Sequence, residues 1–204
     1  MTKPVVGLIG GMGSGKSLVA AALARYGAKV ISGDQLGHEA LRQPEIRERV
    51  IDRWGSGTLD AQGAIDRHRL AKIVFSEPAE RRILESMVFP WIQCRLREEI
   101  ASGQADQQVP LIVLDAAIML EAGWSKDCDR LVYVDTPREV RLQRLTKQRG
   151  WSVKDVEARE NAQLLLTDKK KRADYVVDNG GSPEQLNRQI ADLLKRWGIV
   201  KEEQ

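Results

Sequence analysis

Residues 7–17, GLIGGMGSGKS, contain five glycines, one lysine and two serines. Positions 10–17 fit the pattern G-x-x-x-x-G-K-S/T at every fixed place. Glycines let successive backbone N–H groups approach phosphate oxygens without a Cβ clash, and a helix that begins there adds its positive end. A lysine at this point reaches β- and γ-phosphates, and the following hydroxyl binds Mg²⁺. The segment therefore predicts a nucleoside triphosphate site.

The elements on either side of this segment are those that a phosphate-binding loop requires. VVGLI (residues 5–9) is a short apolar run typical of a buried strand, and KSLVAAALARYG has the alanine-rich composition of a helix ending at Gly27. A chance glycine-rich turn is the alternative, which these flanks disfavour. The sequence holds no N-K-x-D element for guanine, so we expect ATP. The expected phosphate-binding residues are Gly11, Met12, Gly13, Ser14, Gly15, Lys16, Ser17 and Leu18.

Two aspartates follow apolar runs and are candidates for a carboxylate beside the metal. Asp115 ends LIVLD, and Asp135 ends LVYVD. Either could simply cap the turn that follows it. We prefer Asp115, for indirect contact with the Mg²⁺ ion that Ser17 binds, since Thr136 and Pro137 begin a helix directly after Asp135.

Asp34 follows a second apolar run, in VISGDQLGHEAL. In an open parallel sheet, ligands gather at the carboxyl ends of the strands, which would place Asp34 near the phosphates. A carboxylate there can accept the proton of an attacking hydroxyl. The alternative is that Asp34 caps the next helix.

Arginines recur at three-residue spacing in REVRLQRLTKQRG, at Arg138, Arg141 and Arg144, and Arg149 follows near the end of the segment. This spacing places the first three along one side of a helix. Arginines on a segment that closes over a nucleotide stabilise charge in phosphoryl transfer. The polar helical stretch 152–172, ending in KKKR, would complete such a lid. A solvated helix face is the alternative.

The remaining pattern predicts the α/β class. Further apolar strands are expected at residues 28–32, 109–117, 130–136 and 174–181, separated by helical segments. Continuous apolar strands that alternate with helices indicate a parallel sheet covered on both faces. Residues 35–103 are mostly helical in pattern, and Pro90 predicts a kink or break near Phe89. The segment 182–198 begins with Ser-Pro and ends at a glycine, as a terminal helix does.

Composition restricts the classes of partner. The 204 residues carry a net charge of +3, which is too mild to indicate nucleic-acid binding and suits a small anionic substrate. The sequence contains neither a membrane-length apolar run nor a secretory layout at its start, so we expect a cytoplasmic protein without membrane contact. Cys94 and Cys128 have no metal-ligand spacing and are expected to be reduced thiols, and neither His38 nor His68 has a ligand-spaced partner. We expect a monomer or a weak homo-oligomer.

Over nearly its whole length, the chain resembles the dephospho-CoA kinase family. The pieces that carry the resemblance are GLIGGMGSGKS, VISGD, LAKIVF, Phe89-Pro90, DAAIMLE, YVDTP, RLQRL and ADYVVDNGGS. It implies transfer of phosphate from ATP, with Mg²⁺, to the ribose 3′-hydroxyl of dephospho-CoA, the last step of coenzyme A synthesis. It also implies a P-loop NTPase-like three-layer fold with a five-stranded parallel sheet, in one domain of three parts. The expected parts are a nucleotide-binding core (1–34, 109–136 and 174–204), a helical acceptor-binding region (35–108) and a lid (137–173).

The resemblance also implies roles for individual residues. Asp34 would be the general base, Arg144 and Arg149 would attend the ATP phosphates, and Asn179 and Gly180 would line the adenine side. Lys16 and Arg144 join Asp34 as the expected catalytic residues.

The chain departs from the family pattern at several places on the acceptor side. Ser32 stands where the family usually has aspartate, Phe89 where it has histidine, and Ala117 where it has proline, while His38 is near a position that is often arginine. Two alternatives stay open, and the departures concern the first of them. One is a kinase of the same fold for another small acceptor, such as a nucleoside monophosphate. The other is a non-catalytic, ATP-dependent switch.

Overall fold

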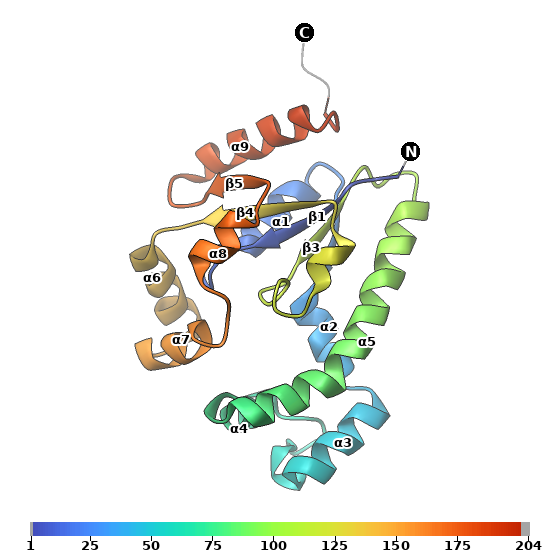
Figure 1. Ribbon diagram of the computed structural model, residues 1–204, viewed down its shortest axis with the longest axis vertical. Coiled ribbons are helices and arrows are strands. Elements are labelled where there is room, and N and C mark those ends of the chain that lie inside the picture. The colour runs from blue at the N-terminus through green and yellow to red at the C-terminus, as the bar shows by residue number, and fades with distance from the viewer. Residues whose placement is uncertain (1, 201–204) are drawn as a thin grey trace. The chain divides into compact units, whose positions relative to one another are not determined.

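The computed structural model describes residues 2–200, apart from the side chains of residues 148 and 149. The chain forms two compact units. The first comprises the residues up to Ser32 and from Glu99 onward, and the second is Gly33–Glu98. Figure 1 shows their elements, coloured from blue at the N-terminus to red at the C-terminus.

The first unit is built on a five-stranded sheet in the order β2-β3-β1-β4-β5. All four neighbouring pairs of strands are parallel, which confirms the predicted class and strand number. Each expected strand is present, and the first has the expected bounds. The strands are β1 (Val5–Ile9), β2 (Lys29–Ser32), β3 (Ile112–Asp115), β4 (Arg130–Asp135) and β5 (Tyr175–Asp178).

Helices α1 (Lys16–Ala24) and α9 (Pro183–Arg196) cover one face of this sheet. Helix α9 lies along the sheet beside β5 in Figure 1. The Ser182 hydroxyl accepts a hydrogen bond from the Gln185 backbone N–H, and the Gln185 side chain accepts one in return, so a capping box begins this helix as its sequence indicates. Each fully buried aliphatic side chain in the core contributes about 1.5–3 kcal/mol by removal from water. The apolar side chains that α9 adds to the core are Leu186, Ile190, Leu193 and Leu194.

The opposite face is covered by the last turns of α5 (Pro78–Ala105) and by the segment that follows β3. Gly7 in β1 permits this close packing, because a Cβ there would lie 2.8 Å from Leu131 Cδ2 and 2.9 Å from Cys128 Sγ. Gly103 in α5 has a similar role, with Ile112 side-chain atoms 2.9 Å from the place of its missing Cβ.

Both cysteines are free thiols, as expected.

After β4 the chain forms α6 (Arg138–Arg149), α7 (Val153–Glu160) and α8 (Leu166–Lys171). The polar stretch predicted as helical is therefore two helices joined by residues 161–165. Ser152 begins α7 with a capping box that includes Asp155. A short 3₁₀ helix, η2 (Trp124–Asp127), precedes β4.

The second unit is helical, as the spacing of its apolar residues predicts. It contains α2 (Gly33–Ala40), α3 (Pro44–Trp54), η1 (Ser56–Thr58), α4 (Arg67–Ser76) and α5 up to Glu98. Glu80 joins α3 to the start of α5 by accepting hydrogen bonds from the Trp54 indole at 2.8 Å and from Arg53 Nε at 3.0 Å.

Pro90 lies inside α5, which continues through it as one ribbon in Figure 1. The sequence predicts a kink or break near Phe89. The helix does not break there, and its ribbon bends partway along its length in Figure 1. A proline removes one helical hydrogen bond, and the burial of neighbouring apolar side chains offsets this loss. Those buried side chains are Met87, Val88, Ile92 and Leu96.

Among the described residues, no helix combines the length and apolar character needed to cross a membrane.

Candidate functional site

The glycine-rich segment forms the turn between the end of β1 and the start of α1, as the sequence predicts. Gly13 and Gly15 have φ angles of +72° and +86°, in the left-handed region that glycine adopts without strain. A Cβ at Gly13 would lie 2.7 Å from the Arg141 carbonyl oxygen, and one at Gly15 would clash with the Asn179 amide nitrogen. Both backbone angle and space therefore require glycine here.

Lys16 is the first residue of α1, and its side chain turns back over the loop. Its Nζ donates hydrogen bonds to the carbonyl oxygens of Gly10 at 3.2 Å and Gly11 at 3.1 Å, and the residue is only 8% exposed. The first N–H groups of α1 belong to the same turn, so an ammonium group and the positive end of a helix occupy one place. This arrangement suits a polyphosphate anion.

The carbonyl oxygen of Ser14 is the point at which the rest of the first unit holds the loop. It accepts hydrogen bonds from Thr136 Oγ1 at 2.9 Å, Asn179 Nδ2 at 2.7 Å and Arg144 at 3.4 Å. A second Arg144 nitrogen donates to the Asn179 carbonyl oxygen at 3.0 Å. The side-chain amide of buried Asn179 thus binds the loop, and Gly180 follows it with its N–H bound to Asp178. Sequence reasoning missed Thr136, although its place directly after an apolar strand was a usable signal.

The arginines of α6 have different partners. Arg141, whose side chain is 6% exposed, donates to the Met12 carbonyl oxygen at 3.2 Å and forms an ion pair with Glu160 of α7 at 2.6 Å. Arg144 binds the loop as described, while exposed Arg138 pairs with Glu157 of α7 at 3.7 Å. The Arg149 side chain lies outside the described residues.

Ser17 and Asp115 meet at the carboxyl ends of β1 and β3. The Ser17 hydroxyl donates to Asp115 Oδ2 at 2.7 Å, and Asp115 is aligned with Leu8 in the register of the two strands. A hydroxyl and a carboxylate side by side are hard oxygen donors of the kind that Mg²⁺ takes. The described residues contain no group of three or more His, Cys, Asp or Glu that could hold a metal. A site with two protein oxygens suits Mg²⁺, which takes its other ligands from phosphate and water.

The other aspartate has a different partner. Asp135 Oδ2 lies 2.7 Å from Lys170 Nζ of α8, and this hydrogen bond raises the pKa of Lys170 above its usual value.

Asp34 is the second residue of α2 and is exposed. It lies inside the first turn of the helix, not in the flanking position that a capping residue takes. Ser32, at the end of β2, is aligned with Asp115 in the register of β2 and β3.

Lys169 belongs to the KKKR run, but its side chain is only 1% exposed. Its Nζ lies 2.8 Å from Glu121 Oε1 and donates to Gln163 Oε1 at 2.9 Å and to the Ala117 carbonyl oxygen at 3.2 Å. Glu121 also accepts the Leu164 backbone N–H at 2.9 Å. This ion pair therefore attaches the 161–165 linker to the segment after β3.

We expect Lys169→Met to lower the free energy of unfolding by about 3–5 kcal/mol, because it leaves the Glu121 carboxylate without its buried partner. Lys171→Met is the matched control, since Lys171 is 79% exposed and its loss costs no more than about 0.5 kcal/mol. Urea unfolding of the two variants and the parent chain measures both effects. Equal stability of the variants would contradict the structural role of Lys169.

Known proteins resemble this chain over most of its length. A family model described as dephospho-CoA kinase matches residues 4–185. A dephospho-CoA kinase of Syntrophotalea carbinolica is 39% identical over 194 residues, covering 94% of this chain and 91% of the relative. One from Geobacter sulfurreducens is 37% identical over 194 residues, covering 93% and 96%.

Solved structures show the same fold. A crystal structure of a Thermus thermophilus protein has a TM-score of 0.78 and 34% identity, covering 96% of this chain and 98% of the other. A dephospho-CoA kinase from Campylobacter jejuni has a TM-score of 0.70 at 22% identity, covering 96% and 97%, and a shikimate kinase from Acinetobacter baumannii has 0.52 at 18%, covering 99% and 97%. These two likenesses concern the fold alone.

Proposed function

The chain belongs to the dephospho-CoA kinase family, and we propose that it transfers the γ-phosphoryl group of ATP to the ribose 3′-hydroxyl of dephospho-CoA, giving coenzyme A and ADP. It is an ATP-dependent kinase with a P-loop fold. The match of residues 4–185 to the family model carries this conclusion, because it includes both the phosphate loop and the helical second unit. A nucleotide switch and a kinase for another acceptor are not favoured by these relatives.

The phosphate loop would hold the β- and γ-phosphates through backbone N–H groups at the start of α1. Lys16 would move from the Gly10 and Gly11 carbonyl oxygens to the phosphates and neutralise the charge that develops during transfer. Arg144 would hold the loop in place for this role, since it donates hydrogen bonds to the Ser14 and Asn179 carbonyl oxygens. Arg149 and Gly180 would complete the nucleotide site, as the resemblance implies.

The Ser17 hydroxyl would bind Mg²⁺, and the Asp115 carboxylate would contact the ion indirectly. Their 2.7 Å hydrogen bond already sets the two oxygen donors beside each other. A bound Mg²⁺ ion would supply charge neutralisation at the phosphate oxygens.

Asp34 would be the general base. Its Cα can lie no further than about 7 Å from that of Ser32, because two residues of chain join them. Ser32 is aligned with Asp115 in the sheet, so this tether supports a place for Asp34 at the carboxyl ends of the strands. Its carboxylate would take the proton from the 3′-hydroxyl as that oxygen forms a bond to the γ-phosphorus. The bond to the β,γ-bridging oxygen breaks, and ADP leaves with that oxygen.

The three parts expected from the sequence form part of the same proposal. Residues 1–34, 109–136 and 174–204 would bind the nucleotide, residues 35–108 would bind the acceptor, and residues 137–173 would act as a lid. The net charge of +3 supports a small anionic substrate rather than nucleic acid. We place this activity in the cytoplasm, without a membrane partner, in a monomer or a weak homo-oligomer.

Coenzyme A formation from dephospho-CoA and ATP tests the activity directly. We expect ADP release to require dephospho-CoA and Mg²⁺, and the new phosphate to reside on the 3′-oxygen of the ribose by ³¹P NMR. A rate of ADP release that is the same without an acceptor would contradict the proposal. Preference for adenosine monophosphate over dephospho-CoA at equal concentration would favour the other acceptor class.

A further inference from the structure

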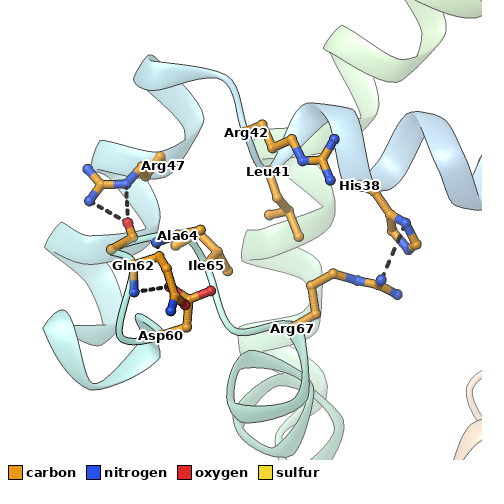
Figure 2. Close-up of a pocket in the computed structure, with 10 residues that line it drawn as sticks. His38, Leu41, Arg42, Arg47, Asp60, Gln62, Ala64, Ile65 and Arg67 are labelled. Atoms are coloured by element: carbon orange, nitrogen blue, oxygen red, sulfur yellow. Dashed lines mark hydrogen bonds between the residues drawn. The ribbon is translucent and has the colours of Figure 1, made fainter.

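The second unit contains a cavity of about 390 Å³ between the end of α2, the start of α3 and the loop that leads into α4. Figure 2 shows two sides of this pocket. His38, Arg42 and Arg67 lie on one side, and Arg47, Asp60 and Gln62 lie on the other. Leu41, Ala64 and Ile65 provide its apolar lining.

On the side of the pocket that carries Arg47, Asp60 and Gln62, the charged side chains bind backbone groups of the loop itself. Asp60 Oδ1 accepts the backbone N–H groups of Gln62 and Ala64, both at 2.9 Å. Arg47 donates to the Gly63 carbonyl oxygen from Nε at 3.0 Å and from a terminal nitrogen at 2.7 Å. These contacts shape the wall and direct Arg47 and Asp60 to backbone groups.

The opposite side presents positive charge. The Arg67 guanidinium lies 3.3 Å from His38 Nδ1, and Arg42 is exposed. Burial lowers the pKa of His38 below its usual value. The positive charges of Arg67 and Arg42 act in the same direction, and the negative charge of Asp34 opposes them. The lowered pKa favours the neutral imidazole at pH 7. Because a guanidinium only donates hydrogen bonds, Nδ1 accepts and Nε2 carries the proton. His38, Arg42 and Arg67 thus offer donors and two positive charges to one ligand.

The spacing on α2 relates this cluster to Asp34. Asp34 and His38 are four residues apart, so they lie on the same face of the helix, about 6 Å apart along its axis. In dephospho-CoA, the 3′-hydroxyl and the 5′-diphosphate are attached to the same ribose. A ribose whose 3′-hydroxyl is at Asp34 can therefore extend its 5′-diphosphate toward the next turn, where His38 lies.

We infer that the pocket bounded by His38, Arg42 and Arg67 binds the 5′-diphosphate of dephospho-CoA. This assignment rests on the proposed function, and it adds the residues that select an acceptor with a diphosphate. Arginine is suited to this task, because its planar group of donors matches phosphate oxygens. The apolar dimethyl group that follows the diphosphate in the acceptor can then pack against Leu41 and Ile65.

Steady-state kinetics with Arg42→Ala tests this inference in the full-length enzyme. We expect the KM for dephospho-CoA to rise about tenfold or more at saturating ATP, the size of effect produced by loss of a charged hydrogen bond. The kcat and the KM for ATP should change by less than about twofold, because the contact is made equally in the ground and transition states. Arg67→Ala should give the same pattern.

Arg49→Ala is the matched control, because Arg49 is an exposed arginine of α3 that does not line the pocket. Its KM for dephospho-CoA should equal that of the parent enzyme. Added salt should raise the KM for dephospho-CoA more in the parent enzyme than in Arg42→Ala, because the variant has one positive charge fewer for the salt to screen. Arg42→Lys should recover part of the loss.

Two failures can be told apart. If the parent enzyme makes coenzyme A normally, and Arg42→Ala and Arg67→Ala match Arg49→Ala in KM, then the inference is overturned while the proposed function stands. If the parent enzyme makes no coenzyme A from dephospho-CoA, both are overturned together.

Discussion

Lys16→Ala is expected to lower kcat/KM for coenzyme A formation by about 10²- to 10³-fold, as removal of one stabilising group at a developing oxyanion does. The ammonium group is held on the Gly10 and Gly11 carbonyl oxygens at 3.1–3.2 Å, so it is already at the loop where the phosphates would bind. Its removal takes away a positive charge that gains importance as the γ-phosphoryl group moves from ADP to the acceptor. ADP release in a coupled assay measures the loss.

Lys195→Ala provides the matched control, because Lys195 is an exposed lysine in the last turn of α9. We expect it to retain full kcat/KM. Thermal unfolding of both variants separates loss of function from loss of the fold. A folded Lys16→Ala enzyme with a tenth or more of the parent kcat/KM would refute the proposed role.

Asp34→Asn is expected to lower kcat by about 10²- to 10⁴-fold, the usual contribution of a general base. Asparagine has nearly the same shape but does not accept the hydroxyl proton at neutral pH. The dissociation constant for ATP, measured by calorimetry, should stay within about twofold of the parent value, because the substitution removes a group that acts on the acceptor.

Asp52→Asn makes the same chemical change at an exposed position of α3 and should leave kcat unchanged. If Asp34→Asn weakens ATP binding as much as it lowers kcat, Asp34 supports the fold and is not the base. A parent-like kcat in Asp34→Asn would also exclude the base role.

The order of the strands and the contacts that hold the phosphate loop could not be read from the sequence. Ser14, Thr136, Arg144 and Asn179 are far apart in the chain, yet three of them donate to the carbonyl oxygen of the first. These contacts form because β4 and β5 lie on one side of β1, an arrangement that depends on packing across the whole sheet. The spacing of residues along the chain does not determine which strands become neighbours in the sheet.

Charged residues show the same limit. The pattern of α6 places Arg138, Arg141 and Arg144 along one side of a helix, but burial distinguishes them. Arg141 is buried and binds the Met12 carbonyl oxygen of the loop, whereas Arg138 is exposed and forms an ion pair with Glu157. Lys169 and Lys171 are equivalent in a basic run, yet their side chains are 1% and 79% exposed. The difference comes from Glu121, which belongs to a distant segment.

Local physics explains why the loop and the strands were predictable. Gly13 and Gly15 reveal a turn because few other residues adopt their left-handed angles, and runs such as Val5–Ile9 reveal strands because both faces of a parallel sheet are buried. The sequence alone therefore specified the phosphate loop, the five strands and the family. Tertiary structure decided which side chains hold that loop, which lysine is buried and where the second unit forms its basic pocket, because each depends on contacts between segments that only the folded chain brings together.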